Sequence, residues 1–215
     1  MKIQLFECNP FAENTYVLYD ETGEAIIVDP GMYGAEECAM VERFVQQRGL
    51  QVRFILLTHA HIDHILGLTW AQKRYGVEVY YHPDEQSIMD TADDMAVVFG
   101  LDGGVRPPED YSYIGEGTSV AFGMTELEVL HVPGHSPGHL CFLERGDKMV
   151  LGGDVLFRES IGRTDLPGGD HDTLIASIYD KLLPLGDEWR VYPGHGPATT
   201  IGHERKHNPF LQQYQ

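Results

Sequence analysis

The first half of the chain alternates short apolar runs with amphipathic stretches. The apolar run at 25–28 is closed by Asp29-Pro30-Gly31, which predicts a strand followed by a turn. From Gly34 to Gly49, apolar residues recur at helical spacing among Glu, Arg and Gln, which predicts a helix that stops at Gly49. The same reasoning predicts a strand at 52–57, a helical stripe from Ile65 to Tyr75 ended by Gly76, and a strand at 77–81.

The second half of the chain is less regular. A helix predicted from Asp84 to about Phe99 gives way to Gly100–Pro108, a stretch of turn formers and a candidate cover for a site. Short strands are predicted at 119–122, 126–132, 140–143 and 149–151. An amphipathic helix with Asp172 as its N-cap spans 174–183, before a strand at 190–192 and a last helix at 201–207. This order favours an α/β fold with two sheets and outer helices, although periodicity also allows one doubly wound sheet.

Length and composition indicate one globular domain. The 215 residues suffice for a sizeable core, and no repeat or linker divides them, so a single domain over 1–215 is expected. Hydrophobic residues make up 42% and charged residues 22%, as in soluble proteins. No apolar stretch approaches the roughly 20 residues that span a bilayer, and the first residues lack the apolar core of a signal peptide. A cytoplasmic protein without membrane contact is therefore expected.

The net charge limits the classes of partner that the chain is expected to bind, and the cysteine spacing indicates the state of the thiols. The formal net charge of −18 opposes attraction to nucleic acid, which normally needs a basic face. The three cysteines, Cys8, Cys38 and Cys141, are widely spaced and are expected to be buried thiols. The sequence gives no indication of the oligomeric state.

The densest group of reactive side chains follows the strand predicted at 52–57. Residues 58–64 read Thr-His-Ala-His-Ile-Asp-His, which places His59, His61, Asp63 and His64 within six positions. Imidazole and carboxylate groups are poor core residues but good ligands for a borderline divalent metal such as zinc or iron. Ligand sites also gather at strand ends in α/β sheets. We therefore predict a metal site here.

Three later segments are candidate companions of this cluster. Each has an apolar run followed by one or two glycines, and they end in His135, Asp154 and His195. Glycine lets a loop turn sharply and approach an ion closely. Together with the first cluster, they supply five histidines and two aspartates, more ligands than one tetrahedral ion takes. Nitrogen and oxygen ligands without sulfur predict two metal ions that share a carboxylate and a water and support hydrolysis.

The pattern His59-x-His61-x-Asp63-His64 with His135, Asp154 and His195 resembles the metallo-β-lactamase superfamily. Within it, the chain is most similar to the short glyoxalase II (hydroxyacylglutathione hydrolase) type. The supporting motifs run from Asn14-Thr15-Tyr16 and Asp29-Pro30-Gly31 to Glu204-Arg205 and Asn208-Pro209-Phe210. The resemblance covers essentially the whole chain. It implies an αββα four-layer sandwich with a dimetal site at one edge of the two sheets.

The resemblance divides the seven ligands between two ions. It implies that His59, His61 and His135 bind the first metal, that Asp63, His64 and His195 bind the second, and that Asp154 bridges them. Two divalent ions are therefore the expected cofactors; zinc is favoured, and the ligand types also suit iron and manganese.

Two further residues are candidates for supporting the ligands. Asp29 either orients a ligand from behind or is only a turn residue, and His139 is either such a support or a surface residue. The other histidines have no spacing that recruits them and are expected to be structural or exposed: His82, His131, His171, His203 and His207.

The resemblance implies hydrolysis of a thioester such as S-lactoylglutathione by a metal-bridging hydroxide, with Asp63 and Asp154 as catalytic residues. A thiol, with a pKa of about 8.5, leaves without a general acid, whereas an amide nitrogen must be protonated. Peptide or β-lactam cleavage therefore fits less well, and zinc β-lactamases resemble the pattern less because Asp154 stands where they have a thiolate or another ligand. Two alternatives stay open. One is a lactone or ester hydrolase with the same ions. The other is a mononuclear iron persulfide dioxygenase, because the stretch Gly162–Asp165 resembles that branch of the family as well.

Arg163 is a candidate substrate-binding residue. In the family, the matching basic residue contacts a substrate carboxylate, and the alternative is a surface Arg paired with Asp165 or Glu159. By the resemblance, a protein without the family's helical C-terminal extension is expected, and Asp165 and Gly196-Pro197 stand where the family places tyrosines. A small-molecule thioester is thus the expected partner, with the natural thiol left open.

Overall fold

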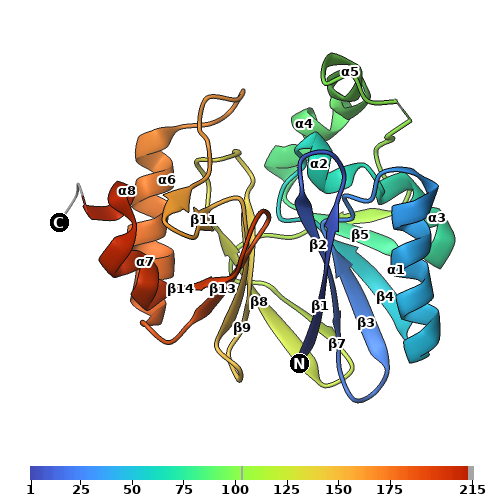
Figure 1. Ribbon diagram of the computed structural model, residues 1–215, viewed down its shortest axis with the longest axis horizontal. Coiled ribbons are helices and arrows are strands. Elements are labelled where there is room, and N and C mark those ends of the chain that lie inside the picture. The colour runs from blue at the N-terminus through green and yellow to red at the C-terminus, as the bar shows by residue number, and fades with distance from the viewer. Residues whose placement is uncertain (103, 213–215) are drawn as a thin grey trace. The chain divides into compact units, whose positions relative to one another are not determined.

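The structure, a computed structural model, describes residues 1–102 and 104–212. This part of the chain forms two compact units (Figure 1). The first comprises Met1–Ile114 and Ala121–Glu126, and the second comprises Gly115–Val120 and the chain from Leu127 onward. The single domain expected over 1–215 stays a prediction.

The first unit is built on a six-stranded sheet in the order β1-β2-β3-β4-β5-β6. Neighbours among the first three strands pair antiparallel, and neighbours from β3 to β6 pair parallel. The carboxyl ends of β3, β4 and β5 therefore meet at one edge, where loops can present ligands. The strands are β1 (Lys2–Cys8), β2 (Glu13–Tyr19), β3 (Glu24–Val28), β4 (Gln51–Leu56), β5 (Glu78–Tyr81) and β6 (Tyr111–Tyr113).

Helices α1 (Gly34–Arg48) and α3 (Leu68–Tyr75) lie on one face of this sheet (Figure 1). They pack into its core through Val41, Val45 and Leu68, which are all fully or almost fully buried. Each helix ends before a glycine in the left-handed region, Gly49 at φ 63° and Gly76 at φ 64°, as the sequence predicts.

The helix predicted over 84–99 is wrong as a single element. The chain instead forms a 3₁₀ turn (Pro83–Glu85) and the short helices α4 (Gln86–Asp90) and α5 (Ala92–Val98). Thr91, between the two helices, has φ −101°, and its hydroxyl donates to the Ile88 carbonyl at 3.0 Å. Its side chain thus competes with the helical hydrogen-bond pattern, which explains the break.

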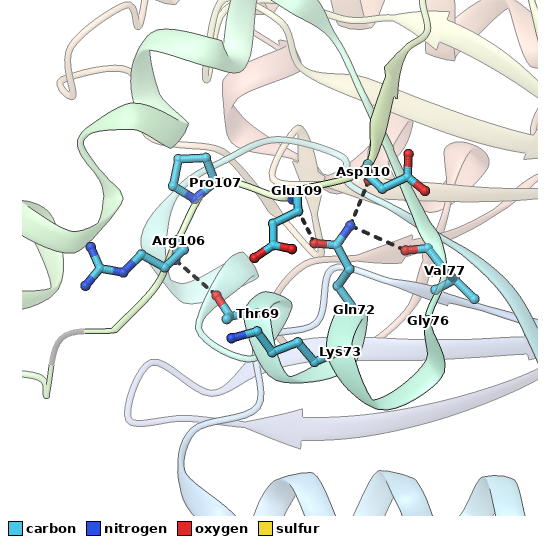
Figure 2. A pocket seen from close by; sticks show the side chains of 9 residues that line it. All are labelled: Thr69, Gln72, Lys73, Gly76, Val77, Arg106, Pro107, Glu109 and Asp110. Carbon is cyan, nitrogen blue, oxygen red and sulfur yellow. Dashed lines mark hydrogen bonds between the residues drawn. The ribbon is translucent and has the colours of Figure 1, made fainter.

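The candidate cover loop at 100–108 is fastened to the helices of the first unit, although its Gly103 lies outside the described residues. Val105 is buried in the core, and the Arg106 N–H donates to Thr69 Oγ1 at 3.0 Å. Just beyond it, the Gln72 amide accepts from the Glu109 N–H at 3.1 Å and donates to the Asp110 carbonyl at 2.7 Å. The residues of these hydrogen bonds, Thr69, Gln72, Arg106, Glu109 and Asp110, are among those that line a hollow of about 300 Å³ (Figure 2). A role as a cover stays a prediction.

Another six-stranded sheet, in the order β14-β13-β10-β9-β8-β7, belongs largely to the second unit; its segment Ala121–Glu126, where β7 leads into β8, belongs to the first. Its central strands β10 and β13 pair parallel, and a separate two-stranded hairpin, β11-β12, follows β10. The strands are β7 (Ser119–Phe122), β8 (Thr125–His131), β9 (Leu140–Glu144), β10 (Met149–Gly153), β11 (Leu156–Phe157), β12 (Ser160–Ile161), β13 (Arg190–Pro193) and β14 (Thr199–Thr200).

Helices α6 (His171–Ser177), α7 (Ile201–His207) and α8 (Pro209–Gln212) lie on one face of the second sheet (Figure 1). The stripe predicted over 174–183 is buried, but α6 continues as a π turn (Ile178–Leu182) and a 3₁₀ turn (Leu183–Leu185). The predicted N-cap is wrong. Asp170 caps α6, because its carboxylate accepts from the Thr173 N–H at 2.7 Å, and Asp172 lies inside the first turn.

The periodicity of the sequence allowed either two sheets with outer helices or one doubly wound sheet. Two separate six-stranded sheets are present, each with helices on a face, so the α/β architecture with two sheets is confirmed. Strands β1 and β2 have no counterpart in the sequence prediction. Within the described residues, none of the helices is long and apolar enough to cross a membrane.

Candidate metal centre

The His-rich motif lies where β4 ends. Thr58 to His61 form the loop after this strand, and Ile62 begins the short helix α2 (Ile62–Ile65), which carries Asp63 and His64. Asp29 follows the neighbouring strand β3, which pairs parallel with β4. The sheet topology therefore places the motif and Asp29 at the same edge, as predicted for a ligand site.

We call His59, His61, Asp63 and His64 the first ligand group. His59 and His64 are fully buried, and their ring centroids are 4.1 Å apart; the His59 and His61 centroids are 4.7 Å apart. Ligand atoms of Asp29, His59 and His64 lie within 4.8 Å of one another. Asp63 Oδ2 lies 3.9 Å from His64 Nε2, so the structure brings together the four predicted ligands of the first unit.

The Asp29 carboxylate contacts Thr58 and His64 and so supports this group. Its backbone has φ 50°, a left-handed conformation that Asp tolerates better than most residues. One carboxylate oxygen accepts from the Thr58 N–H at 2.7 Å, and the other accepts from the Thr58 hydroxyl at 2.6 Å and lies 3.1 Å from His64 Nδ1. Of the two roles open for Asp29, this geometry favours the support of a ligand, because a proton held on Nδ1 leaves Nε2 to bind a metal.

The sequence analysis missed three residues that contact this part of the site. The Glu85 carboxylate, fully buried, accepts from the Ala60 N–H at 2.8 Å. The Asn9 amide donates to the carbonyls of Gly31 and Asp63, both at 2.8 Å. The Glu13 carboxyl is also fully buried, and its Oε1 lies 3.9 Å from His64 Nδ1. Isolated acidic and amide residues at turns give no periodic signal, so the pattern along the sequence could not find them.

We call His135, Asp154 and His195 the second ligand group. They follow the ends of β8, β10 and β13, and the last two of these strands pair parallel. One carboxylate oxygen, Asp154 Oδ2, lies 3.6 Å from His135 Nε2 and 3.5 Å from His195 Nε2. The structure thus brings together the three predicted ligands of the second unit around one carboxylate.

Two hydrogen bonds orient this second ligand group. His135 Nδ1 lies 2.8 Å from the Arg163 carbonyl oxygen, which can only accept, so Nδ1 carries the proton and Nε2 is left as the ligand. The Asp154 N–H donates to His139 Nε2 at 3.0 Å. His139 is fully buried and not a surface residue, and it therefore holds the backbone of Asp154 in place.

The Arg163 side chain forms a forked pair with Asp165. Its Nε and Nη2 donate to the two carboxylate oxygens at 2.7 and 2.8 Å. The hydrogen bonds from Arg163 lower the pKa of Asp165 to about 2. Both side chains are exposed, whereas Glu159 pairs with His203 instead, at 3.0 Å. The contact of Arg163 with the second ligand group is made by its backbone carbonyl, which bonds to His135. Substrate contact by its guanidinium stays a prediction.

The donor set fits a borderline divalent metal. The two ligand groups offer imidazole nitrogen and carboxylate oxygen, the donors that zinc and iron share in catalytic sites. All three cysteines are buried as expected, and burial raises the pKa of Cys8 to about 12, which keeps this thiol protonated and unsuited to metal binding.

Comparison with known proteins places the chain in a family. The family profile described as the metallo-beta-lactamase superfamily matches residues 8–195. Hydroxyacylglutathione hydrolase GloC of Haemophilus influenzae is 37% identical over 212 residues, which cover 98% of each chain.

Two solved structures resemble the whole chain. The BLEG-1 B3 metallo-beta-lactamase has a TM-score of 0.89 and 38% identity, with 98% of this chain and 99% of that chain covered. TTHA1623 in a di-iron-bound form has a TM-score of 0.86 and 39% identity, with 97% and 100% covered. The predicted metallo-β-lactamase-like fold and family resemblance are confirmed. The chain therefore belongs to the metallo-β-lactamase superfamily, as one of its metal-dependent hydrolases.

Proposed function

We propose that this chain is a dimetal hydrolase that cleaves a small-molecule thioester of the S-lactoylglutathione kind. The observation that carries the proposal is the donor set of the two ligand groups, in which His64 and His135 each have Nδ1 beside an oxygen, so that Nε2 is the nitrogen that would bind a metal. The 37% identity to hydroxyacylglutathione hydrolase GloC supports a thioester as the substrate.

The proposal assigns the seven ligands to two ions. His59, His61 and His135 bind one ion, Asp63, His64 and His195 bind the other, and Asp154 bridges them. The position of Asp154 Oδ2 supports the bridge, since this single oxygen neighbours His135 and His195, which are assigned to different ions. Zinc is the metal we propose, and the di-iron form of the similar protein TTHA1623 makes iron the second outcome of a metal analysis.

When bound, the two ions would lower the pKa of a shared water toward about 7 and offer positive charge to the carbonyl oxygen of the substrate. Neighbouring residues hold the proposed ligands in position. Asp29 and the Arg163 carbonyl fix the imidazoles of His64 and His135, and His139 fixes the backbone of Asp154. Each side chain of the two ligand groups is committed as a ligand, so none is left to protonate a leaving group. A thiolate, which needs no proton to leave, suits this site best.

A substrate panel tests the proposal. Metal-analysed protein is mixed with S-lactoylglutathione, its oxygen-ester analogue, a lactone and a cephalosporin, and oxygen uptake is followed with glutathione persulfide. We expect rapid thiol release, slower cleavage of the oxygen ester and no oxygen uptake. β-Lactam opening is the second candidate, favoured by the 38% identity to the BLEG-1 B3 metallo-beta-lactamase. Thiol release no faster than the uncatalysed rate would contradict thioester hydrolysis.

Gly162→Ala is expected to lower kcat/KM about 10²-fold, because a misplacement of about 1 Å in a catalytic group can cost that much. A Cβ at this position would stand 1.9 Å from the Asp154 carbonyl oxygen and 3.1 Å from His135 Nδ1, so the second ligand group must shift. Gly146→Ala is the matched control, since its Cβ would meet only the flexible carboxylate of Glu144. Steady-state kinetics of both variants check the expectation, and an equal effect in the two would contradict it.

Arg163→Met is expected to raise KM for S-lactoylglutathione about two- to fivefold, the effect of one exposed charge contact. The N-acetylcysteamine thioester of lactate has no carboxylate, and its KM should not change. Asp165→Asn should shift the first KM in the opposite direction, because it removes the carboxylate that occupies the Arg163 guanidinium. Equal changes for both substrates would show that Arg163 does not bind the substrate carboxylate.

A further inference from the structure

Glu13, the first residue of β2, is a buried carboxyl group without a cationic partner. Its side chain is fully buried, and Oε2 accepts from the Thr15 hydroxyl at 2.8 Å. In the described part of the chain, no hydrogen-bond donor reaches Oε1, and no lysine or arginine forms an ion pair with this residue. A buried carboxylate without compensation is strongly destabilising, so a cation or a polar partner is expected nearby.

The group that Glu13 faces is His64. Glu13 Oε1 lies 3.9 Å from His64 Nδ1, the same nitrogen that lies 3.1 Å from Asp29 Oδ2. Two carboxyl groups therefore flank one edge of this imidazole, whose other nitrogen is assigned to a metal. Negative charge behind a histidine ligand raises its basicity and fixes its orientation.

The packing holds the Glu13 carboxyl group close to the turn at Gly31. The Thr15 hydroxyl that donates to Glu13 also accepts from the Gly31 N–H at 2.9 Å. A Cβ on Gly31 would stand 2.0 Å from Glu13 Oε2 and 2.4 Å from the Asp63 carbonyl oxygen. Only glycine at position 31 lets the carboxyl group and the ligand-bearing helix α2 come this close.

We propose that Glu13 is a positioning residue for the metal site, whose buried carboxylate compensates, through His64, the charge of the ion that His64 binds. The inference rests on the proposed function, because that function assigns the ion to His64. The competing explanation is purely structural: Glu13 holds the turn at Gly31 through Thr15, and its charge is irrelevant.

The substitution Glu13→Gln separates the two explanations. Glutamine keeps an oxygen that can accept from the Thr15 hydroxyl and removes the charge. Loss of a supporting partner of a metal ligand typically weakens metal affinity by about 10- to 100-fold. We therefore expect one of the two ions to bind about 10- to 100-fold more weakly in this variant, measured by competition with a chromogenic chelator and by metal analysis after dialysis.

Glu204→Gln is the matched control. Glu204 is likewise fully buried, but it lies in the second unit, and its carboxylate accepts from the Glu159 N–H at 2.8 Å and the Asn208 amide at 2.9 Å. Its contacts include none of the seven proposed ligands. This variant should lose stability and keep the metal affinity of the unsubstituted protein.

The outcomes separate the inference from the proposed function. If the unsubstituted protein binds two ions and Glu13→Gln binds them equally well, the positioning role is overturned and the proposed function stands. If the unsubstituted protein binds fewer than two ions, both are overturned. If Glu13→Gln does not fold, Glu13→Met serves instead, because an apolar side chain of similar volume removes the cost of the buried charge. The same 10- to 100-fold weakening is expected, and unchanged affinity would overturn the proposal.

Discussion

Asp154→Asn is expected to lower kcat/KM for the thioester by about 10³-fold, which corresponds to about 4 kcal/mol of transition-state stabilisation. The proposed bridge depends on one charged oxygen, Asp154 Oδ2, which neighbours both His135 Nε2 and His195 Nε2. An asparagine is neutral, offers a single acceptor oxygen and cannot bridge two cations as well. The fold should persist, because the side chain keeps its shape and the backbone N–H still donates to His139.

Kinetics and metal analysis of the same preparation check this expectation. Asp172→Asn is the matched control, since Asp172 lies exposed in the first turn of α6 and does not cap that helix. The control should keep the activity and metal content of the unsubstituted protein. An Asp154→Asn variant with two bound ions and activity reduced by less than about tenfold would exclude the bridging role.

Removal of the metal ions is expected to abolish hydrolysis and to lower the melting temperature by about 5–10 °C. An ion present at about 100 times its Kd stabilises the folded state by about 2.7 kcal/mol, and each kcal/mol shifts Tm by about 2–4 °C for a chain of this size. Without an ion, the buried imidazoles of His59 and His64 lose the partner that the proposal gives them.

Thermal unfolding with and without a chelator, followed by restoration with zinc or iron, measures both effects. Restored activity should return in proportion to the metal bound. If chelated protein, shown by analysis to be metal-free, still released thiol at the original rate, the hydrolysis would not depend on a metal.

The sequence predicts where the residues of the two ligand groups lie, because these residues follow strand ends. The strands expected at 25–28, 52–57 and 149–151 are present, and Asp29, the His-rich motif and Asp154 follow them directly. A buried strand appears in the sequence as an apolar run, and a polar residue after it is visible as a break in that run. This is why these polar residues could be singled out from the sequence alone.

The supporting residues could not be predicted in the same way. Glu13 and Glu85 are fully buried, yet acidic residues normally indicate an exposed position, so the local pattern is misleading there. Their burial goes with tertiary contacts, to His64 for Glu13 and to the Ala60 N–H for Glu85. The helix expected over 84–99 failed for a related reason, because the Thr91 hydroxyl bonds to the backbone and ends the first helix.

A metal titration tests the central claim most directly. Metal-free protein is loaded with zinc in steps, and thiol release from S-lactoylglutathione is measured at each ratio of metal to chain. A dimetal thioester hydrolase predicts that activity rises until about two ions are bound per chain and then stays constant. Full activity with a single ion would contradict the two-metal site, and no thiol release at any ratio of zinc or iron would contradict thioester hydrolysis itself.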